Sequence, residues 1–438
     1  MTIVERPVAA APPSPRADLR DTGIDLVRAL CIIAVVVLHA LMVGVTVADT
    51  GPVFANASEG SWWITPLSWM LQVMPLFFVI GGFAGWTALR RSQRRGGTAA
   101  AFVSGRLHRL LLPALAVIAT VGTALLLLAV TGVPADLLHI AGYRYAQPLW
   151  FLGTFLLCQA LLPVLARAHD RAPLGSLAVL AALAAGIDVL RLLTGVEALG
   201  FANLAFVWLT LQQLGFHLAD GRIDALSRRA RVRIALGAVA VLVISMLCGI
   251  HSPDLIANLN PPTTALILVG LAHTMVLSLL RERLSVWSRR PALTALHTFV
   301  NRRAMTIYLW HMPVLLATAG VLALWALGAG TPLPAPGSAE WWLTRPIWLI
   351  ATLVLTAAVA VPLARLESRR APAAHATGAR LVLGTLCGLV AVVLLLVAGT
   401  DPATALAASA LIVAALQLAR APRVRSRSTP DDAERIRG

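Results

Sequence analysis

Three ionisable residues interrupt the first long apolar stretch of the sequence. Asp25, Arg28 and His39 lie within Asp25-Leu-Val-Arg28-Ala-Leu-Cys-Ile-Ile-Ala-Val-Val-Val-Leu-His39. In an α-helix, Arg28 and His39 would project from nearly the same face, about 16 Å apart along the axis. Asp25 precedes Arg28 by three residues, close enough to pair with it. If Arg28 lies at a membrane surface, His39 is expected near the middle of the bilayer.

An ionisable group at that depth is costly, and it usually faces the protein interior or a water-filled cavity. A functional role for His39 is therefore the first hypothesis. The alternative is a buried structural histidine that is hydrogen-bonded to a neighbouring helix.

A second candidate site is Arg106-Leu-His-Arg109, at the start of the third apolar segment. Arginines at positions i and i+3 of a helix share a face, and their forked donors suit phosphate or carboxylate groups. The alternative is that Arg106 and Arg109 only anchor the helix end by the positive-inside rule.

Two further segments carry candidate binding residues. Tyr308 and His311 lie one turn apart near the start of the ninth apolar segment, and Pro313 is expected to bend the helix beside them. They form either an intramembrane site or a packed polar pair. Trp150 begins the fourth segment, where interfacial anchoring alone would explain a tryptophan.

The candidate residues above lie in or beside long apolar segments, and the composition of the chain indicates that these segments cross a membrane. The chain of 438 residues is 58% hydrophobic and 13% charged, and its mean hydropathy is +0.80. Apolar blocks of about 18 to 25 residues recur along it, which is the length that spans a bilayer as a helix. The sequence therefore predicts an all-α polytopic membrane protein.

Twelve spans are predicted. Their approximate bounds are 24–47, 65–89, 107–130, 148–166, 174–193, 201–219, 233–250, 263–280, 303–327, 345–364, 380–399 and 403–419. Pro75 and the pair Gly81-Gly82 interrupt the second span, where they are expected either to kink the helix or to let another helix or a ligand approach closely, with helix packing the commoner explanation. The arginines concentrate in alternate loops, so the positive-inside rule places both termini in the cytoplasm.

The predicted organisation has four parts. Residues 1–20 are a disordered cytoplasmic tail, and 21–367 form a ten-span core. Residues 380–419 add two helices with almost no polar residue, interpreted as structural, and 420–438 form a basic cytoplasmic tail. The net charge of +16 is spread over these loops rather than on one domain, so we predict no nucleic-acid partner. The four cysteines have no metal-ligand spacing, and no metal is predicted.

The motifs together resemble those of the acyltransferase 3 family of integral-membrane acyltransferases. The family's Arg-x10-His pattern on the first span is met by Arg28 and His39, and its Arg-x-x-Arg motif by Arg106 and Arg109. The run Phe77-Phe78-Val-Ile-Gly81-Gly82-Phe83 resembles the second-span segment of the family. The segment Ile307-Tyr308-Leu-Trp-His311-Met-Pro313 resembles its ninth-span signature. The resemblance covers roughly 21–365.

The resemblance implies a mechanism. Acyl-CoA would be the donor substrate, with no permanently bound cofactor, and its phosphates would be held by Arg106 and Arg109. His39 would deprotonate an acceptor hydroxyl or carry the acyl group itself. Arg28 would stabilise charge on the thioester side, oriented by Asp25. Trp150, Tyr308 and His311 are expected to contact substrate.

One departure stands out: many family members have a glutamate shortly after the fourth-span tryptophan, whereas Trp150 is followed by no acid. A secondary transporter of a small solute is the main alternative, although no internal repeat relates the two halves. The expected acceptor is a hydroxyl of an envelope glycan, a glycolipid or a small metabolite. The protein is expected to lie in the cell membrane, in contact with membrane lipids.

Overall fold

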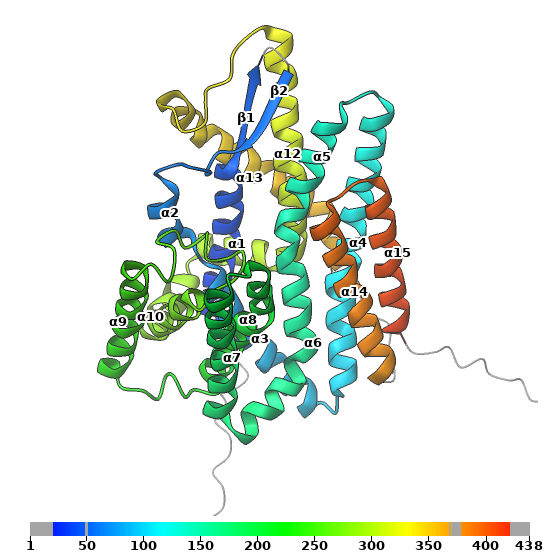
Figure 1. Ribbon diagram of the computed structural model, residues 1–438. Helices are drawn as coiled ribbons and strands as arrows, with labels where there is room; N and C mark the ends of the chain where they lie inside the picture. Colours follow the sequence, from blue (N-terminus) through cyan, green and yellow to red (C-terminus); the bar gives the residue numbers. More distant parts are fainter. Residues whose placement is uncertain (1–20, 49–50, 368, 370–377, 421–438) are drawn as a thin grey trace, which may run out of the picture.

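The computed structural model describes residues 21–48, 51–367, 369 and 378–420. The predicted tail at 1–20 lies outside these residues, as does nearly all of the predicted tail at 420–438. The described part of the chain is a bundle of helices with one two-stranded hairpin (Figure 1). The prediction of an all-α polytopic membrane protein is confirmed.

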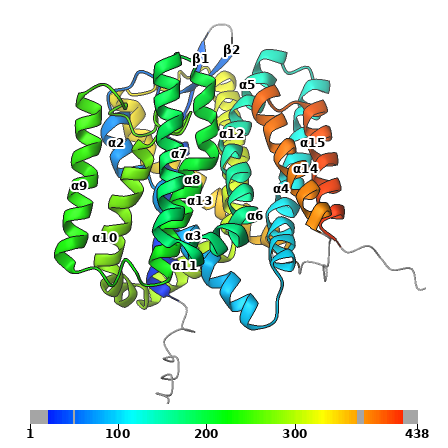
Figure 2. The same cartoon turned by 60° about the horizontal axis from the view of Figure 1, so that its bottom comes forward.

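The helices are α1 (Thr22–Met42), α2 (Ile64–Leu71), α3 (Met74–Arg94), α4 (Ala99–Val130), α5 (Ala135–Ala146), α6 (Trp150–Arg171), α7 (Pro173–Thr194), α8 (Asn203–Ala219), α9 (Arg228–Leu247), α10 (Ala265–Ser288), α11 (Pro291–Arg302), α12 (Ala304–Ala329), α13 (Ala339–Glu367), α14 (Gly378–Ala398) and α15 (Pro402–Leu418). The short 3-10 helices are η2 (Gln147–Leu149) and η3 (Glu197–Ala202), and the strands are β1 (Val43–Ala48) and β2 (Gly51–Asn56). Helices that are distant in the chain lie side by side in the bundle, with α9 and α10 on one side and α14 and α15 against α4 on the other (Figures 1 and 2).

The first helix is shorter than its apolar sequence suggests. The Asp21 carboxylate caps its start by accepting a hydrogen bond from the Ile24 amide at 3.0 Å, and the helix ends at Met42. The next residues, rich in β-branched valine and threonine, form β1 rather than continuing the helix to residue 47. His39 therefore lies in the last turn of α1, closer to the end of the helix than the predicted bounds of 24–47 placed it.

The two ends of the bundle differ in composition. We call the end that carries β1 and β2 the hairpin end. The opposite end, where α1 begins and α3 ends, is the arginine-rich end. It carries exposed arginines such as Arg94, Arg228 and Arg229.

Eleven segments within the described residues are long and apolar enough to cross a membrane. They match the first eleven predicted spans, with α2 and α3 forming one segment and α5 and α6 another. The predicted twelfth span is α15, an apolar helix of 17 residues. At 1.5 Å per residue it is about 26 Å long, close to the lower limit for a span. Eleven full-length spans and one shorter apolar helix thus replace the twelve that were predicted.

The predicted second span is broken before Pro75 and continuous at Gly81 and Gly82. α2 ends at Leu71 and α3 begins at Met74, so the break directly precedes Pro75. Proline fits this position because the first turn of a helix has no use for its missing N–H. Gly81 and Gly82 lie inside α3, which is unbroken there, so of their two predicted roles it is the close approach of another helix that is confirmed, at Gly82.

The glycines of α3 instead bring it close to α8. A Cβ on Gly82 would lie 2.1 Å from the carbonyl oxygen of Gln212. In the opposite direction, a Cβ on Gly215 of α8 would lie 2.1 Å from the carbonyl oxygen of Val79. Small residues commonly allow such close contacts between membrane helices.

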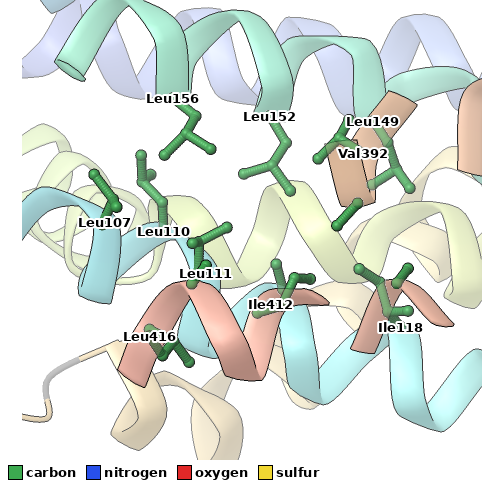
Figure 3. Close-up of a cluster of buried hydrophobic side chains, with 14 of the residues drawn as sticks. Leu107, Leu110, Leu111, Ile118, Leu149, Leu152, Leu156, Val392, Ile412 and Leu416 are labelled. Atoms are coloured by element: carbon green, nitrogen blue, oxygen red, sulfur yellow. The ribbon is translucent and has the colours of Figure 1, made fainter. Parts of the chain in front are cut away.

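The last two helices pack into the core rather than standing apart from it. Figure 3 shows the buried cluster in which Val392 of α14 and Ile412 of α15 meet Leu111 of α4 and Leu152 of α6. Leu111 and Leu152 are fully buried. α14 and α15 therefore complete the apolar core around α4 and α6.

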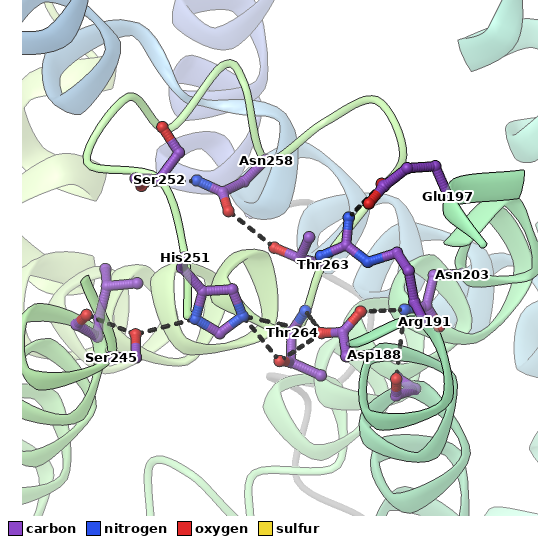
Figure 4. Close-up of polar contacts among 12 residues, drawn as sticks. Asp188, Arg191, Glu197, Asn203, Ser245, His251, Ser252, Asn258, Thr263 and Thr264 are labelled. Atoms are coloured by element: carbon purple, nitrogen blue, oxygen red, sulfur yellow. Dashed lines mark hydrogen bonds and ion pairs between the residues drawn. The ribbon is translucent and has the colours of Figure 1, made fainter. Parts of the chain in front are cut away.

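A polar network joins α7 to the segment between α9 and α10 (Figure 4). The Asp188 carboxylate accepts a hydrogen bond from the side-chain amide of Asn203 at 2.9 Å. It also accepts one from the backbone N–H and one from the hydroxyl of Thr264, at 2.7 Å each. His251 contacts the hydroxyl groups of Ser245 at 2.9 Å and Thr264 at 3.3 Å. Asp188, Asn203 and Ser245 are buried, and His251 and Thr264 are half-buried. Because these side chains hydrogen-bond to one another, we interpret the network as a structural link between the helices.

Candidate active site

One cavity of about 760 Å³ collects most of the predicted site residues. Six of the eight line it: Arg28, His39, Arg106, Arg109, Trp150 and Tyr308. The other two, Asp25 and His311, are buried beside it without being part of its lining. Residues from α1, α4, α6 and α12 thus converge on one space, whose volume lies in the range of small-molecule sites.

His311 of α12 lies next to His39. Its Nε2 is 3.1 Å from His39 Nδ1, and the two ring centroids are 4.9 Å apart. On its other side, His311 Nδ1 lies 2.5 Å from the backbone carbonyl oxygen of Tyr308. Each histidine was predicted on its own helix, and the contact between them was not predicted.

This arrangement favours one placement of the protons on two neutral rings. A carbonyl oxygen can only accept a hydrogen bond, so a neutral His311 carries its proton on Nδ1. His311 Nε2 is then an acceptor, and His39 must donate to it from Nδ1. In neutral His39 this leaves Nε2 unprotonated. The two hydrogen bonds therefore favour the tautomer of His39 in which Nε2 can take a proton.

Asn301, near the end of α11, holds Arg28. Its Oδ1 accepts a hydrogen bond from Arg28 Nε at 2.8 Å, and its Nδ2 donates to the backbone carbonyl of Asp25 at 2.7 Å. One amide thus ties α11 to two successive turns of α1. Asn301 was not predicted as a site residue. The available signal was its position at the head of the segment that contains Tyr308 and His311.

The arginine-rich end of the cavity has an excess of positive charge. Arg28, Arg106 and Arg109 line it together with one carboxylate, Glu367 at the end of α13. Arg106 is half-buried, with its guanidinium 4.9 Å from the centre of the Phe102 ring, whereas Arg109 is exposed. Three guanidinium groups against one carboxylate favour an anionic ligand at this end.

Glu367 is a second lining residue that the sequence analysis missed. It accepts hydrogen bonds from the Thr306 amide at 3.3 Å and from the Thr306 hydroxyl at 3.1 Å, at the start of α12. No local motif surrounds it in the sequence, because its partner lies 61 positions away. Only the packing of α13 against α12 brings it to the cavity.

Tyr308 and Trp150 are held by neighbours on other helices. The Tyr308 hydroxyl donates to the Pro148 carbonyl at 2.7 Å and accepts from the Leu152 amide at 3.2 Å, which ties α12 to the start of α6. Trp150 stacks on Trp208 of α8, with ring centroids 5.3 Å apart. Both side chains are thus positioned to present fixed aromatic surfaces to the cavity.

A wall of the cavity comes from α14. Val393, Leu396 and Val397 line it near the hairpin end. From the sequence, this helix was predicted to be structural because it has almost no polar residue. An apolar helix can nevertheless form an apolar wall of a binding site.

A group with metal-ligand chemistry lies at the arginine-rich ends of α6 and α8, away from the cavity lining. The ligand atoms of His169, His217 and Asp220 lie within 4.8 Å of one another. Gln213 Nε2 is 3.0 Å from His169 Nδ1, His169 Nε2 is 2.9 Å from Asp220 Oδ2, and Arg222 Nε donates to the same oxygen at 2.8 Å. Because these groups pair with one another and with a guanidinium, we assign no metal to them.

Comparison with known proteins agrees with the motifs. No curated protein and no solved structure matches the chain. A family match, described as an acyltransferase domain, covers residues 21–365, from the start of α1 to within α13. It includes every predicted site residue and Asn301, but neither Glu367 nor α14. With well over half of its length matched, the chain belongs to the acyltransferase 3 family.

Proposed function

We propose that the chain transfers a short acyl group, such as acetyl, from a coenzyme A thioester to a hydroxyl group of an envelope glycan, a glycolipid or a small metabolite. The observation that carries this proposal is a single cavity with two different ends. Arg28, Arg106 and Arg109 line one end, and His39 lines the other with its tautomer set by His311. The first end suits the phosphates of the donor, and the second suits the activation of a hydroxyl.

The spacing of Arg28 and His39 along α1 agrees with donor binding at one end of the cavity and hydroxyl activation at the other. Arg28 and His39 are separated by about 16 Å along α1, too far for both to act on one atom. A coenzyme A thioester has its phosphates at one end and its reactive carbonyl at the other, joined by the extended pantetheine arm. Phosphates near Arg106 and Arg109 would let the arm run through the cavity toward His39.

The proposed reaction is a single displacement at the thioester carbonyl. His39 Nε2 accepts the proton of the acceptor hydroxyl while the hydroxyl oxygen forms a bond to the carbonyl carbon. The carbon–sulfur bond then breaks, and the proton on His39 passes to the departing thiolate of coenzyme A. The products are an ester and free coenzyme A, and His39 returns to its neutral form.

We further propose that the arginine-rich end faces the cytoplasm of the cell membrane, with both termini on that side. The positive-inside rule supports this orientation. It would open the donor end of the cavity to the compartment that contains acyl-CoA. His39, in the last turn of α1, would then lie toward the opposite face, where an envelope acceptor is found.

The test is acyl transfer by purified His39→Ala protein, with radiolabelled acetyl-CoA as donor and an envelope extract as acceptor. Loss of a general base typically lowers the rate by about 10²–10⁴. The matched control is His139→Ala, which removes an exposed histidine of α5. Undiminished transfer by a well-folded His39→Ala protein would remove His39 from the mechanism.

A further inference from the structure

The hairpin end of the cavity is bounded on two sides by different parts of the chain. Val393 and Val397 of α14 line one side, and Phe201 of η3 and Leu204 of α8 line the other. Figures 1 and 2 show α14 and the α7–α8 pair on either side of α6. The start of α6, with Trp150, lines the cavity between them.

These lining residues also reach the outer surface of the bundle. Val397 is 83% exposed, Val393 is 54% exposed and Phe201 is 48% exposed. A side chain that both lines a cavity and lies on the surface marks an opening. α14 and the η3–α8 segment are both long and apolar enough to cross a membrane, where lipid surrounds exposed apolar side chains. We call the opening between these exposed lining residues the side mouth.

The side mouth differs in chemistry from the donor end. The arginines and the carboxylate that line the cavity, namely Arg28, Arg106, Arg109 and Glu367, belong to the arginine-rich end. Around the side mouth the lining residues are apolar or are uncharged, such as Gln147 and Asn260. A charged substrate would have to lose its hydration there without compensation, whereas an alkyl chain would not. His39, in the last turn of α1, lies toward this same end.

We propose that the acceptor is an amphipathic lipid that enters through the side mouth. Its alkyl chain lies along the start of α6, with α14 on one side and η3–α8 on the other, and its hydroxyl-bearing head reaches His39 within the cavity. This inference rests on the proposed acyl transfer and narrows the acceptor to a lipid-borne hydroxyl. Part of this lipid site is built by α14, which follows the residues matched by the family domain.

The experiment uses a long-chain primary alcohol with a diazirine near its hydroxyl, added to the full-length protein in lipid nanodiscs. After illumination, the adducts are located by peptide mass spectrometry. The informative residue is Leu38, which lines the cavity and is only 8% exposed. We expect an adduct on the peptide that contains Leu38, because the alcohol must enter the cavity to reach it. Labelling confined to the outward faces of the helices would overturn the proposal.

Variants of the side mouth provide the second arm. Val393→Trp and Val397→Trp fill the mouth, and each is expected to lower labelling of the Leu38 peptide by about tenfold. The matched control is Val390→Trp on the same helix, whose valine is 52% exposed and does not line the cavity. Two mouth variants are tested in case one of them does not fold. Size-exclusion chromatography and thermal unfolding show which variants are folded. Unchanged labelling in both folded variants would also overturn the proposal.

The same assay separates this inference from the proposed function. Photolabelling needs no chemistry on a thioester, so His39→Ala is expected to retain the Leu38 adduct while losing acyl transfer. If the adduct forms normally but the native protein transfers no acyl group, the lipid site stands and the proposed function fails. If acyl transfer to extracted acceptors occurs but no adduct forms in the cavity, the proposal of a lipid acceptor is wrong and the proposed acyltransferase function stands.

Discussion

His39 Nδ1 on α1 lies 3.1 Å from His311 Nε2 on α12, within hydrogen-bond distance. The two residues are 272 positions apart in the chain, and this contact connects the predicted catalytic helix to the ninth-span motif. His311 is not among the residues that line the cavity. In the proposed mechanism it is therefore a positioning residue that acts through His39, whereas the sequence predicts a substrate-binding residue.

His311→Phe and His311→Gln distinguish this role from simple packing. Phenylalanine removes the acceptor for His39 Nδ1, and misplacement of a catalytic group commonly lowers kcat by about 10²-fold. Glutamine can place an amide oxygen near the position of Nε2, so we expect it to restore part of kcat. The KM for acetyl-CoA should stay close to that of the native protein in both variants. Equal losses of kcat in both variants would show that His311 only fills space.

Removal of Arg106 or Arg109 is expected to weaken donor binding selectively. A hydrogen bond to a charged group contributes about 1.5–3 kcal/mol, so Arg106→Ala should raise the KM for acetyl-CoA by roughly tenfold or more. The matched control is Arg94→Ala, which removes an exposed arginine at the same end of the bundle but outside the cavity. Normal acetyl-CoA binding by both cavity variants, measured by calorimetry, would leave Arg106 and Arg109 as topological anchors.

The sequence was most informative where hydrophobicity alone determines structure. Apolar length placed eleven of the spans, because a membrane helix must satisfy its backbone within a continuous apolar segment. The same criterion failed at Val43, where apolar residues continue into β1 instead of α1. Outside the bilayer, β-branched residues can form a strand, and the apolar pattern does not distinguish the two.

Six of the eight residues predicted from sequence line one cavity, but the sequence did not predict how they are arranged. Arg28 and His39 were found from their spacing, since both lie on one helix. The contacts of His311 with His39 and of Asn301 with Arg28 join helices far apart in sequence, and no local pattern encodes which helices are neighbours. For the same reason α14 was interpreted as structural, although Val393 lines the cavity.

Gly82→Ala should destabilise the protein without changing the residues of the site. The new Cβ would lie 2.1 Å from the Gln212 carbonyl, so α3 and α8 would have to separate. Overpacking of this kind typically costs about 1–3 kcal/mol. Gly237→Ala on α9 is the control, because nothing lies within 4 Å of its Cβ and alanine favours a helix. A fluorescence-detected melting curve in detergent measures both, and equal melting temperatures would contradict the close contact.

The proposed orientation can be tested with single cysteines in a background without the four native ones. Gly97→Cys and Ala225→Cys lie at the arginine-rich end, and Asn56→Cys and Ala335→Cys lie at the hairpin end. A membrane-impermeant maleimide added to intact cells should label only the last two. After permeabilisation all four should react, which controls for accessibility. Labelling of Ala225→Cys in intact cells would show that the proposed orientation or the number of spans is wrong.

Asn301 should act through Arg28, and a double-mutant cycle can show it. Arg28→Ala removes the guanidinium, and Asn301→Ala removes its partner at 2.8 Å. If Asn301 serves to orient Arg28, the double variant should be no worse in kcat/KM for acetyl-CoA than Arg28→Ala, whereas independent residues would give losses that add.

Asn301→Asp separates the two hydrogen bonds of this side chain. Aspartate keeps an oxygen for Arg28 but cannot donate to the Asp25 carbonyl, so retained kcat/KM would assign the function to the contact with Arg28. A loss as large as that of Asn301→Ala, with a lowered melting temperature, would instead assign it to the tie between α11 and α1. Additive losses in the double variant would contradict the coupling, because two residues that share one hydrogen bond cannot both lose it independently.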